Sequence, residues 1–225
     1  MFDVGRSSLI CAMNYFIFLI ILFFPAHASA MEAQHVKRVV DGDTLLLDDN
    51  RFVRYIGINA PEVRHGNEKA EPFGIEAKMQ HAGLVGEGDI VYLVYGIEKS
   101  DRYGRKLAYV YTREKKFVNR LMLEQGWAYY LFKEPNLRYH DLFLLAQRLA
   151  MQGRQGMWQG WKVHALNIVG NKRSRRFHRE SCSFGMRTAK SNRIAFNRLW
   201  EAFWEGYAPC KKCFPRGPFS VYTEK

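Results

Sequence analysis

Short β-rich runs separated by turn residues fill the first half of the chain and restrict the folds that it can adopt. The runs are rich in Val, Leu, Ile and Tyr and cover residues 34–40, 44–47, 51–58, 89–95 and 106–111. Asp41-Gly42-Asp43 and Asp48-Asp49-Asn50 are typical turn sequences between the first three runs. We therefore expect five short strands, of which the first three form a meander.

Three segments with helical patterns accompany these strands. They cover residues 72–84, 117–125 and 138–151. The last is the clearest, because Leu142, Leu145 and Leu149 share one face of a helix. Short strands with interspersed helices are typical of small Greek-key barrels. The sequence thus predicts a mainly β fold with α elements, a five-stranded barrel of the OB type with about three helices.

The first 30 residues have the pattern of a targeting segment. Arg6 precedes an apolar run from Leu9 to Phe24, and small residues at alternate positions end at Ala30. The run has 16 residues, fewer than the roughly 20 that span a bilayer comfortably. We expect a signal peptide in residues 1–30, or alternatively an uncleaved N-terminal anchor. Either one predicts an exported protein, periplasmic or secreted, with membrane attachment in the second case.

The positive charge of the chain lies near its C-terminus. The 225 residues include 34 Lys and Arg against 22 Asp and Glu, and residues 161–225 hold 14 of these basic residues and only 4 of the acidic ones. Such an excess predicts a polyanionic partner, either nucleic acid or an anionic membrane surface. The length excludes a large multidomain enzyme and suits one domain with a small additional module.

A set of polar residues clusters at the ends of the predicted strands. The set consists of Asp41, Asp43, Thr44, Arg54, Asn59, Glu62 and Arg105. Carboxylates activate water, guanidinium groups bind phosphate through paired donors, and calcium prefers oxygen ligands. Hydrolysis of a phosphodiester uses all three. Each motif also has a plainer interpretation, since Asp-Gly-Asp is common in hairpin turns and single arginines often lie on solvated faces.

The order of several motifs resembles that of the thermonuclease, or staphylococcal nuclease-like, family. The matching phrases are Val40-Asp41-Gly42-Asp43-Thr44, Arg54-Tyr55-Ile56-Gly57-Ile58-Asn59-Ala60-Pro61-Glu62 and Asp101-Arg102-Tyr103-Gly104-Arg105-Lys106-Leu107-Ala108-Tyr109. Val118-Asn119, Gln125-Gly126-Trp127-Ala128 and Gly156-Met157-Trp158 continue the match. The resemblance covers about residues 34–160. It implies an OB-fold nuclease that uses calcium to hydrolyse DNA and RNA and leaves 3′-phosphate ends.

The resemblance also assigns roles to single residues. It implies that Arg54 and Arg105 clamp the scissile phosphate and that Glu62 is the general base for the attacking water. Asp43 becomes a direct calcium ligand, with Asp41 as outer support. These assignments make Glu62 the residue on which catalysis depends.

Three further positions qualify the resemblance. Asn59 stands where the family usually has an Asp that binds calcium, so we expect a site with one charge fewer and weaker metal affinity. Ala60 replaces a common Thr, and its backbone carbonyl remains as the implied ligand. Tyr103 either stacks on a nucleotide base or is a half-buried tyrosine at a strand end.

The C-terminal segment carries a possible metal-binding pattern. His178 and Cys182 are four residues apart, and Cys210 and Cys213 follow as a C-x2-C pair. Pairs of soft ligands separated by a loop suit a tetrahedral zinc site, which would stabilise a module with a small core. Disulfide pairing or reduced thiols are the alternatives, although the number of cysteines after residue 30 is odd.

This segment also resembles the zinc-binding domain at the start of the bacterial Ada DNA-repair protein. The similarity rests on Cys182, Asn192, Phe196, Glu201-Ala202, Gly206-Tyr207 and Pro209-Cys210-Lys211-Lys212-Cys213-Phe214-Pro215. His178 stands where that family has its first cysteine. The resemblance implies a small zinc-binding α/β module, but no alkyl transfer.

A basic run precedes the first of these ligands. Lys172, Arg173, Arg175 and Arg176 either contact nucleic-acid phosphates or form a solvated loop. We expect the barrel domain in residues 34–160, a linker in 161–170, the basic module in 171–215 and a tail in 216–225.

The sequence as a whole favours an exported, calcium-dependent nuclease acting on DNA or RNA, with no protein partner predicted. A non-catalytic protein that binds single strands on an OB-fold nuclease frame is the alternative. An envelope scaffold whose basic tail contacts anionic lipid is a second one. The presence of Glu62 with both arginines favours the nuclease, because binding alone needs no general base.

Overall fold

The structure is a computed structural model that describes residues 31–63, 70–161 and 166–220. The predicted signal peptide or anchor in residues 1–30 lies outside this part. Among the described helices, none combines the length and the apolar character needed to cross a membrane.

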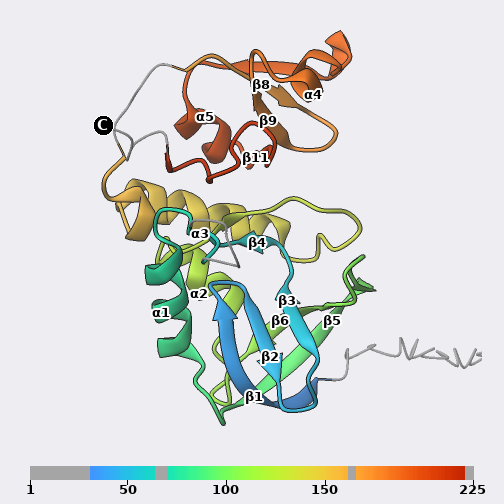
Figure 1. Ribbon diagram of the computed structural model, residues 1–225, viewed down its shortest axis with the longest axis vertical. Coiled ribbons are helices and arrows are strands. Elements are labelled where there is room, and N and C mark those ends of the chain that lie inside the picture. The colour runs from blue at the N-terminus through green and yellow to red at the C-terminus, as the bar shows by residue number, and fades with distance from the viewer. Residues whose placement is uncertain (1–30, 64–69, 162–165, 221–225) are drawn as a thin grey trace, which may run out of the picture.

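Five strands close into a barrel in the N-terminal half of the chain (Figure 1). In barrel order they are β1 (Glu32–Asp41), β2 (Thr44–Leu47), β3 (Phe52–Tyr55), β6 (Lys106–Tyr111) and β5 (Ile90–Ser100). All neighbours are antiparallel except β3 and β6, which run parallel. The predicted five-stranded barrel in a mainly β fold is confirmed, and β1 to β3 form the expected meander.

The third predicted strand is interrupted, which corrects the expectation of one strand over 51–58. Gly57 has φ +77°, and a Cβ placed on it would lie 2.6 Å from the ring of Phe143. After this residue the chain leaves the barrel, and β4 (Ile58–Asn59) pairs with β7 (Tyr129–Tyr130) instead. The break carries Asn59 and the residues after it to one end of the barrel.

Three helices cover the barrel, as predicted. They are α1 (Gly74–Leu84), α2 (Val118–Glu124) and α3 (His140–Gln152). Helix α3 has two buried faces, because Phe143 and Ala146 belong to the barrel core, whereas Ala150 and Met151 belong to a second apolar cluster. It therefore lies between the barrel and the C-terminal module (Figure 1).

The C-terminal module is a small sheet with short helices. Its elements are β8 (Ile168–Asn171), β9 (Arg176–Arg179), α4 (Ser183–Met186), η2 (Lys190–Asn192), β10 (Arg193–Phe196), α5 (Leu199–Trp204) and β11 (Ala208–Pro209). The strands lie in the order β10-β8-β9-β11. The α/β character matches the prediction, and β8 begins inside the range that we expected to be a linker.

The two modules share the second apolar cluster. Trp158, which lies in the 3-10 helix η1 (Gly156–Trp158), and Trp161 pack against Phe203 of α5 at ring distances of 5.2 and 5.8 Å. From α3, Gln147 Nε2 donates to the Phe203 carbonyl at 2.5 Å and Arg148 Nε donates to the Trp204 carbonyl at 2.8 Å. Buried aromatic contacts and hydrogen bonds thus fix the position of the C-terminal module against the barrel.

Candidate functional site

The turn between β1 and β2 is packed tightly against its neighbours. A Cβ on Gly42 would lie 2.5 Å from the Cβ of Ala60, so only glycine fits there. Asp41 Oδ1 accepts a hydrogen bond of 2.9 Å from the backbone N–H of Asp43, and both side chains are buried. The Asp-Gly-Asp motif is therefore part of a buried polar site as well as a turn.

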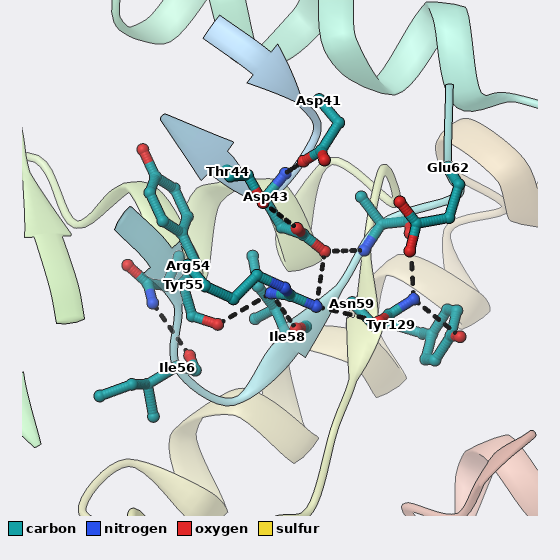
Figure 2. Close-up of polar contacts among 12 residues, drawn as sticks. Asp41, Asp43, Thr44, Arg54, Tyr55, Ile56, Ile58, Asn59, Glu62 and Tyr129 are labelled. Atoms are coloured by element: carbon teal, nitrogen blue, oxygen red, sulfur yellow. Dashed lines mark hydrogen bonds and ion pairs between the residues drawn. The ribbon is translucent and has the colours of Figure 1, made fainter. Parts of the chain in front are cut away.

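Asp43 lies at the centre of this site (Figure 2). Its Oδ2 accepts from Arg54 Nη2 at 2.9 Å and from the Ala60 N–H at 2.6 Å, and its Oδ1 accepts from the Thr44 hydroxyl at 3.0 Å. Burial raises the pKa of Asp43 to about 7, against the opposing effect of Arg54 and with a further increase from Asp41. Asp43 and Asp41 are two buried carboxylates, of which only Asp43 is paired with the Arg54 guanidinium, so a bound cation would balance the remaining negative charge.

Arg54 is held at the end of β3 by four acceptors. Its Nη1 donates to the carbonyls of Tyr55 and Ile58, both at 2.9 Å, and its Nη2 also donates to Asn59 Oδ1 at 2.9 Å (Figure 2). The side chain is 11% exposed. Its guanidinium is therefore oriented before any substrate arrives.

Asn59 is buried, and its amide group links three parts of the site. While Oδ1 accepts from Arg54, Nδ2 donates to the Ala60 carbonyl at 3.0 Å and to the Tyr129 hydroxyl at 2.9 Å. The oxygens of Asn59 and Ala60 that were predicted to bind calcium thus have protein partners. Ligation by both would require the Asn59 amide to exchange these bonds for an ion, and their role as ligands stays a prediction.

Arg105 and Tyr103 lie in the turn between β5 and β6. Arg105 is paired with Asp101 at 2.8 Å, and its guanidinium lies 5.6 Å from the Tyr103 ring centre. Tyr103 is 68% exposed, so the alternative of a half-buried tyrosine is wrong. The guanidinium of Arg102 also lies over this ring, at 4.8 Å from its centre, so a base that stacks on Tyr103 would compete with these arginines, and stacking stays a prediction.

These side chains converge on one cleft. A cleft of about 710 Å³ is lined by Arg54, Asn59, Glu62, Tyr103 and Arg105, together with residues of the C-terminal module. The structure therefore brings together the three residues that were expected to perform the chemistry, although they come from separate segments. Asp43, which is paired with Arg54, and Asp41 are both buried and are not among the residues that line the cleft.

Three residues near this cleft were missed in the sequence. Glu71 Oε2 accepts from the Glu62 N–H at 3.4 Å, and burial raises the pKa of Glu71 to about 7, with a further contribution from the charge of Glu62. Tyr129 orients Asn59, and Lys211 contacts Glu62 Oε1 at 3.0 Å. No local pattern marks them: the partners of Tyr129 and Lys211 are 70 and 149 residues away, and Glu71 meets Glu62 only because the chain between them folds back.

His81 is a fourth such residue, since the sequence identified it only as a surface or core histidine. Its Nδ1 lies 2.7 Å from the Asp41 carbonyl, which can only accept, so Nδ1 carries the proton. Its Nε2 therefore accepts from the Tyr55 hydroxyl at 2.7 Å. Burial lowers the pKa of His81 to about 4. The neutral ring supports the Asp41 turn from beneath.

Comparison with known proteins agrees with this geometry. A family model described as staphylococcal nuclease homologue matches residues 52–160. The chain is 36% identical over 131 residues to a thermonuclease of Staphylococcus intermedius, covering 57% of this chain and 77% of that protein. The chain belongs to the staphylococcal nuclease family. It is therefore a nuclease, a phosphodiester hydrolase.

Two further relatives support this family membership. A thermonuclease of Staphylococcus hyicus is 34% identical over 127 residues, covering 55% of this chain and 73% of that protein. Endonuclease YncB of Bacillus subtilis is 33% identical over 127 residues, covering 55% of this chain and 60% of that protein. The family model ends at residue 160, so the C-terminal module lies beyond the part that it matches.

The C-terminal module of this family member gathers the four predicted ligands. The donor atoms of His178, Cys182, Cys210 and Cys213 lie within 4.8 Å of one another, and the three cysteines are free thiols. His178 Nδ1 is 3.6 Å from the Cys182 sulfur and 3.8 Å from the Cys213 sulfur. Zinc bonds of about 2.0–2.3 Å place the ligands of a tetrahedral site roughly 3.5–3.8 Å apart. The two distances from His178 match this spacing, and donor atoms as far as 4.8 Å apart would close by about 1 Å around a zinc ion.

The basic run divides between two places. Lys172 and Arg173 are exposed near the turn after β8, and Arg175 lies 5.0 Å from the Tyr207 ring centre. Arg176 instead lies on β9 and lines the cleft of the nuclease domain. Of the four basic residues, only Arg176 is placed beside the predicted catalytic groups.

Proposed function

We propose that this nuclease is a calcium-dependent enzyme that is exported and hydrolyses DNA, RNA or both within the cleft. One observation carries the proposal: Arg54, Arg105 and Glu62 line the same cleft. The buried pair of Asp41 and Asp43 supplies the negative charge and hard oxygen atoms that calcium prefers.

The roles of the side chains follow from their positions. Glu62, 36% exposed at the cleft, takes a proton from water as the water oxygen attacks phosphorus and the bond to the leaving oxygen breaks. Arg54 and Arg105 donate paired hydrogen bonds to the phosphate oxygens and neutralise the charge that develops there. Both Nη groups of Arg54 already donate to protein acceptors, so paired donation to a phosphate requires at least one of these four bonds to be exchanged for a phosphate oxygen.

The calcium ligands in this proposal are Asp43, the Ala60 carbonyl and Asn59 Oδ1, with Asp41 as outer support. A bound calcium ion supplies positive charge next to the phosphate. Asp43 and Asp41 hold that position through the tight turn at Gly42. An Asn at residue 59 provides an oxygen without a charge, so we expect weak calcium affinity.

A structural zinc ion in the C-terminal module is the second part of the proposal. His178, Cys182, Cys210 and Cys213 form a closed set of four ligands, which leaves no open position for catalysis. Its role would be to stabilise a module whose sheet consists of strands of two to four residues.

Glu62→Gln tests the nuclease mechanism, with Glu76→Gln as the control because Glu76 is exposed on α1, away from the cleft. Cleavage of single-stranded DNA is followed with calcium, with magnesium and with a calcium-selective chelator. We expect calcium-dependent cleavage that falls at least about 100-fold in Glu62→Gln and is unchanged in Glu76→Gln. Tight binding without cleavage under every metal condition would instead support the non-catalytic alternative.

A further inference from the structure

The catalytic cleft has walls from both modules. Arg54, Tyr103 and Arg105 line it from the barrel, whereas Arg176, Cys210 and Lys211 line it from the C-terminal module. The shared apolar cluster around Trp158 and Phe203 holds these walls together. A strand of nucleic acid whose scissile phosphate lies between Arg54 and Arg105 therefore runs beside the C-terminal module.

Arg176 is a cation without an acidic partner among the described residues. Its Nη1 donates to the Pro209 carbonyl at 3.2 Å, and no ion pair joins its guanidinium to a described carboxylate. By contrast, Arg54 is paired with Asp43 and Arg105 with Asp101. A partly buried arginine that faces a cleft with only a carbonyl as partner is suited to an anionic ligand.

Lys211 reaches the cleft from the turn between two of the candidate zinc ligands. Backbone hydrogen bonds of 3.0 Å from Cys213 and Phe214 to the Cys210 carbonyl fix this turn. The Lys211 side chain is 73% exposed, and its Nζ contacts Glu62 Oε1 at 3.0 Å. Its neighbour Lys212 points elsewhere, because its Nζ contacts the Ser183 hydroxyl of α4 at 3.1 Å. Only one lysine of this turn lines the cleft.

We propose that the C-terminal module is the second wall of the substrate site, where Arg176 and Lys211 bind the backbone phosphate next to the scissile one. This inference rests on the proposed function, because it takes the cleft as the place of cleavage. In the protein without substrate, Lys211 lies on Glu62. When the strand enters, the ammonium moves to the phosphate and leaves Glu62 free to accept a proton.

The energetics favour this exchange of partners. An exposed ion pair such as that of Lys211 and Glu62 contributes little to stability, so it is readily broken. The four-carbon stem of lysine allows the ammonium to move while the turn stays in place. Arg176 is already fixed by β9 and by the Pro209 carbonyl, and a phosphate beside it would satisfy its remaining donors.

Binding measurements in the Glu62→Gln background separate this role from catalysis. The affinity for a fluorescein-labelled single-stranded oligonucleotide is measured by anisotropy over a series of salt concentrations, with Lys211→Ala and Lys212→Ala compared. We expect Lys211→Ala to weaken binding roughly fivefold, as for one charge-assisted contact partly screened by solvent, and to reduce the salt slope by about 0.7. Equal affinities and slopes for the two alanine variants would overturn the inference.

A substrate-length comparison in the protein with Glu62 present provides a second test. A dinucleoside monophosphate has only the scissile phosphate and cannot draw Lys211 away from Glu62, so we expect Lys211→Ala to leave its kcat/KM unchanged or to raise it slightly. For the longer strand we expect Lys211→Ala to lower kcat/KM, mainly through KM. Faster cleavage of both substrates by Lys211→Ala would contradict the inference. It would show that Lys211 inhibits the enzyme by covering Glu62 and does not bind the substrate. Absence of cleavage by the unaltered protein would overturn the proposed function, whereas normal cleavage with equivalent Lys211→Ala and Lys212→Ala variants would overturn only the inference.

Discussion

The barrel site and the His-Cys cluster are both suited to a cation, but different interactions hold them. Asp43 accepts hydrogen bonds from Thr44 and Ala60 and forms an ion pair with Arg54. These interactions hold the residues of the barrel site together without a bound ion. The donor atoms of the cluster lie within 4.8 Å of one another, and His178 Nδ1 is 3.6 and 3.8 Å from the sulfurs of Cys182 and Cys213, distances too long for strong hydrogen bonds. Removal of metal should therefore affect the structure of the C-terminal module far more than that of the barrel.

The largest expected effect is loss of structure in the C-terminal module when a zinc ligand is removed. Cys182→Ser should destabilise this module by at least about 3 kcal/mol, because zinc binding supplies much of the folding energy of small metal domains. Hydrogen exchange measured by peptide should increase across residues 168–214 and stay unchanged across 32–47 and 90–111. Ser181→Ala, at an exposed neighbouring position, is the control. Equal increases in hydrogen exchange in both modules would show that the His-Cys cluster is no more important to its own module than to the barrel.

The next largest effect should come from replacing the forked guanidinium of Arg54 by an ammonium group of the same charge. Arg54→Lys keeps the charge but loses the fork that meets Asp43, Asn59 and two carbonyls, so we expect kcat to fall about 100-fold. Steady-state cleavage of single-stranded DNA provides the measurement. Arg51→Lys is the matched control, because Arg51 pairs with Glu32 and Asp49 and does not line the cleft. A decrease of less than about fivefold would show that charge alone suffices at this position.

The contribution of the neutral His81 ring to the stability of the barrel site should be lost at acidic pH. His81 has a pKa near 4 in the folded protein, whereas histidine titrates near 6.5 in an unfolded chain. The unfolded state thus binds more protons, and the stability present above about pH 6.5 is lost as the pH falls towards 4, by about 3 kcal/mol. Urea unfolding of the protein and of His81→Gln should show a smaller loss in the variant. If the free energy of unfolding falls with pH by the same amount in the unaltered protein and in His81→Gln, this role of His81 is contradicted.

The smallest effect concerns calcium affinity. Asn59→Asp adds a negative charge and removes the Nδ2 donor that now contacts the Ala60 carbonyl, so we expect about tenfold tighter calcium binding. Calorimetric titration measures this change. Asn50→Asp, in an exposed turn beside Lys37, is the control for a general charge effect. If Asn59→Asp leaves the dissociation constant for calcium unchanged, then residue 59 does not lie near the ion.

The sequence predicted the barrel and most of its site because that information is local. Turn residues separate the strands, and the motifs around Asp43, Glu62 and Arg105 each lie within a few residues of a strand end. The break at Gly57 was missed, since it depends on the ring of Phe143 packing where a Cβ would be. The four candidate zinc ligands were proposed from their spacing, and the structure brings their donor atoms within 4.8 Å of one another.

The sequence did not predict that the two modules meet at the cleft. Lys211 and Glu62 are 149 residues apart, and no motif connects them. Their contact depends on how Trp158, Trp161 and Phe203 pack between the modules, and the shape of such an apolar interface is not encoded in a local pattern. For the same reason Arg176 could not be distinguished from its basic neighbours in the sequence.

A crystal structure of the Glu62→Gln protein with calcium and a short single-stranded DNA would test most directly whether the cleft between the modules is the substrate site. We predict one backbone phosphate between Arg54 and Arg105 and the next one within hydrogen-bond distance of Lys211 and Arg176. A strand bound on another face of the molecule, or one that enters the cleft without contacting the C-terminal module, would contradict this account.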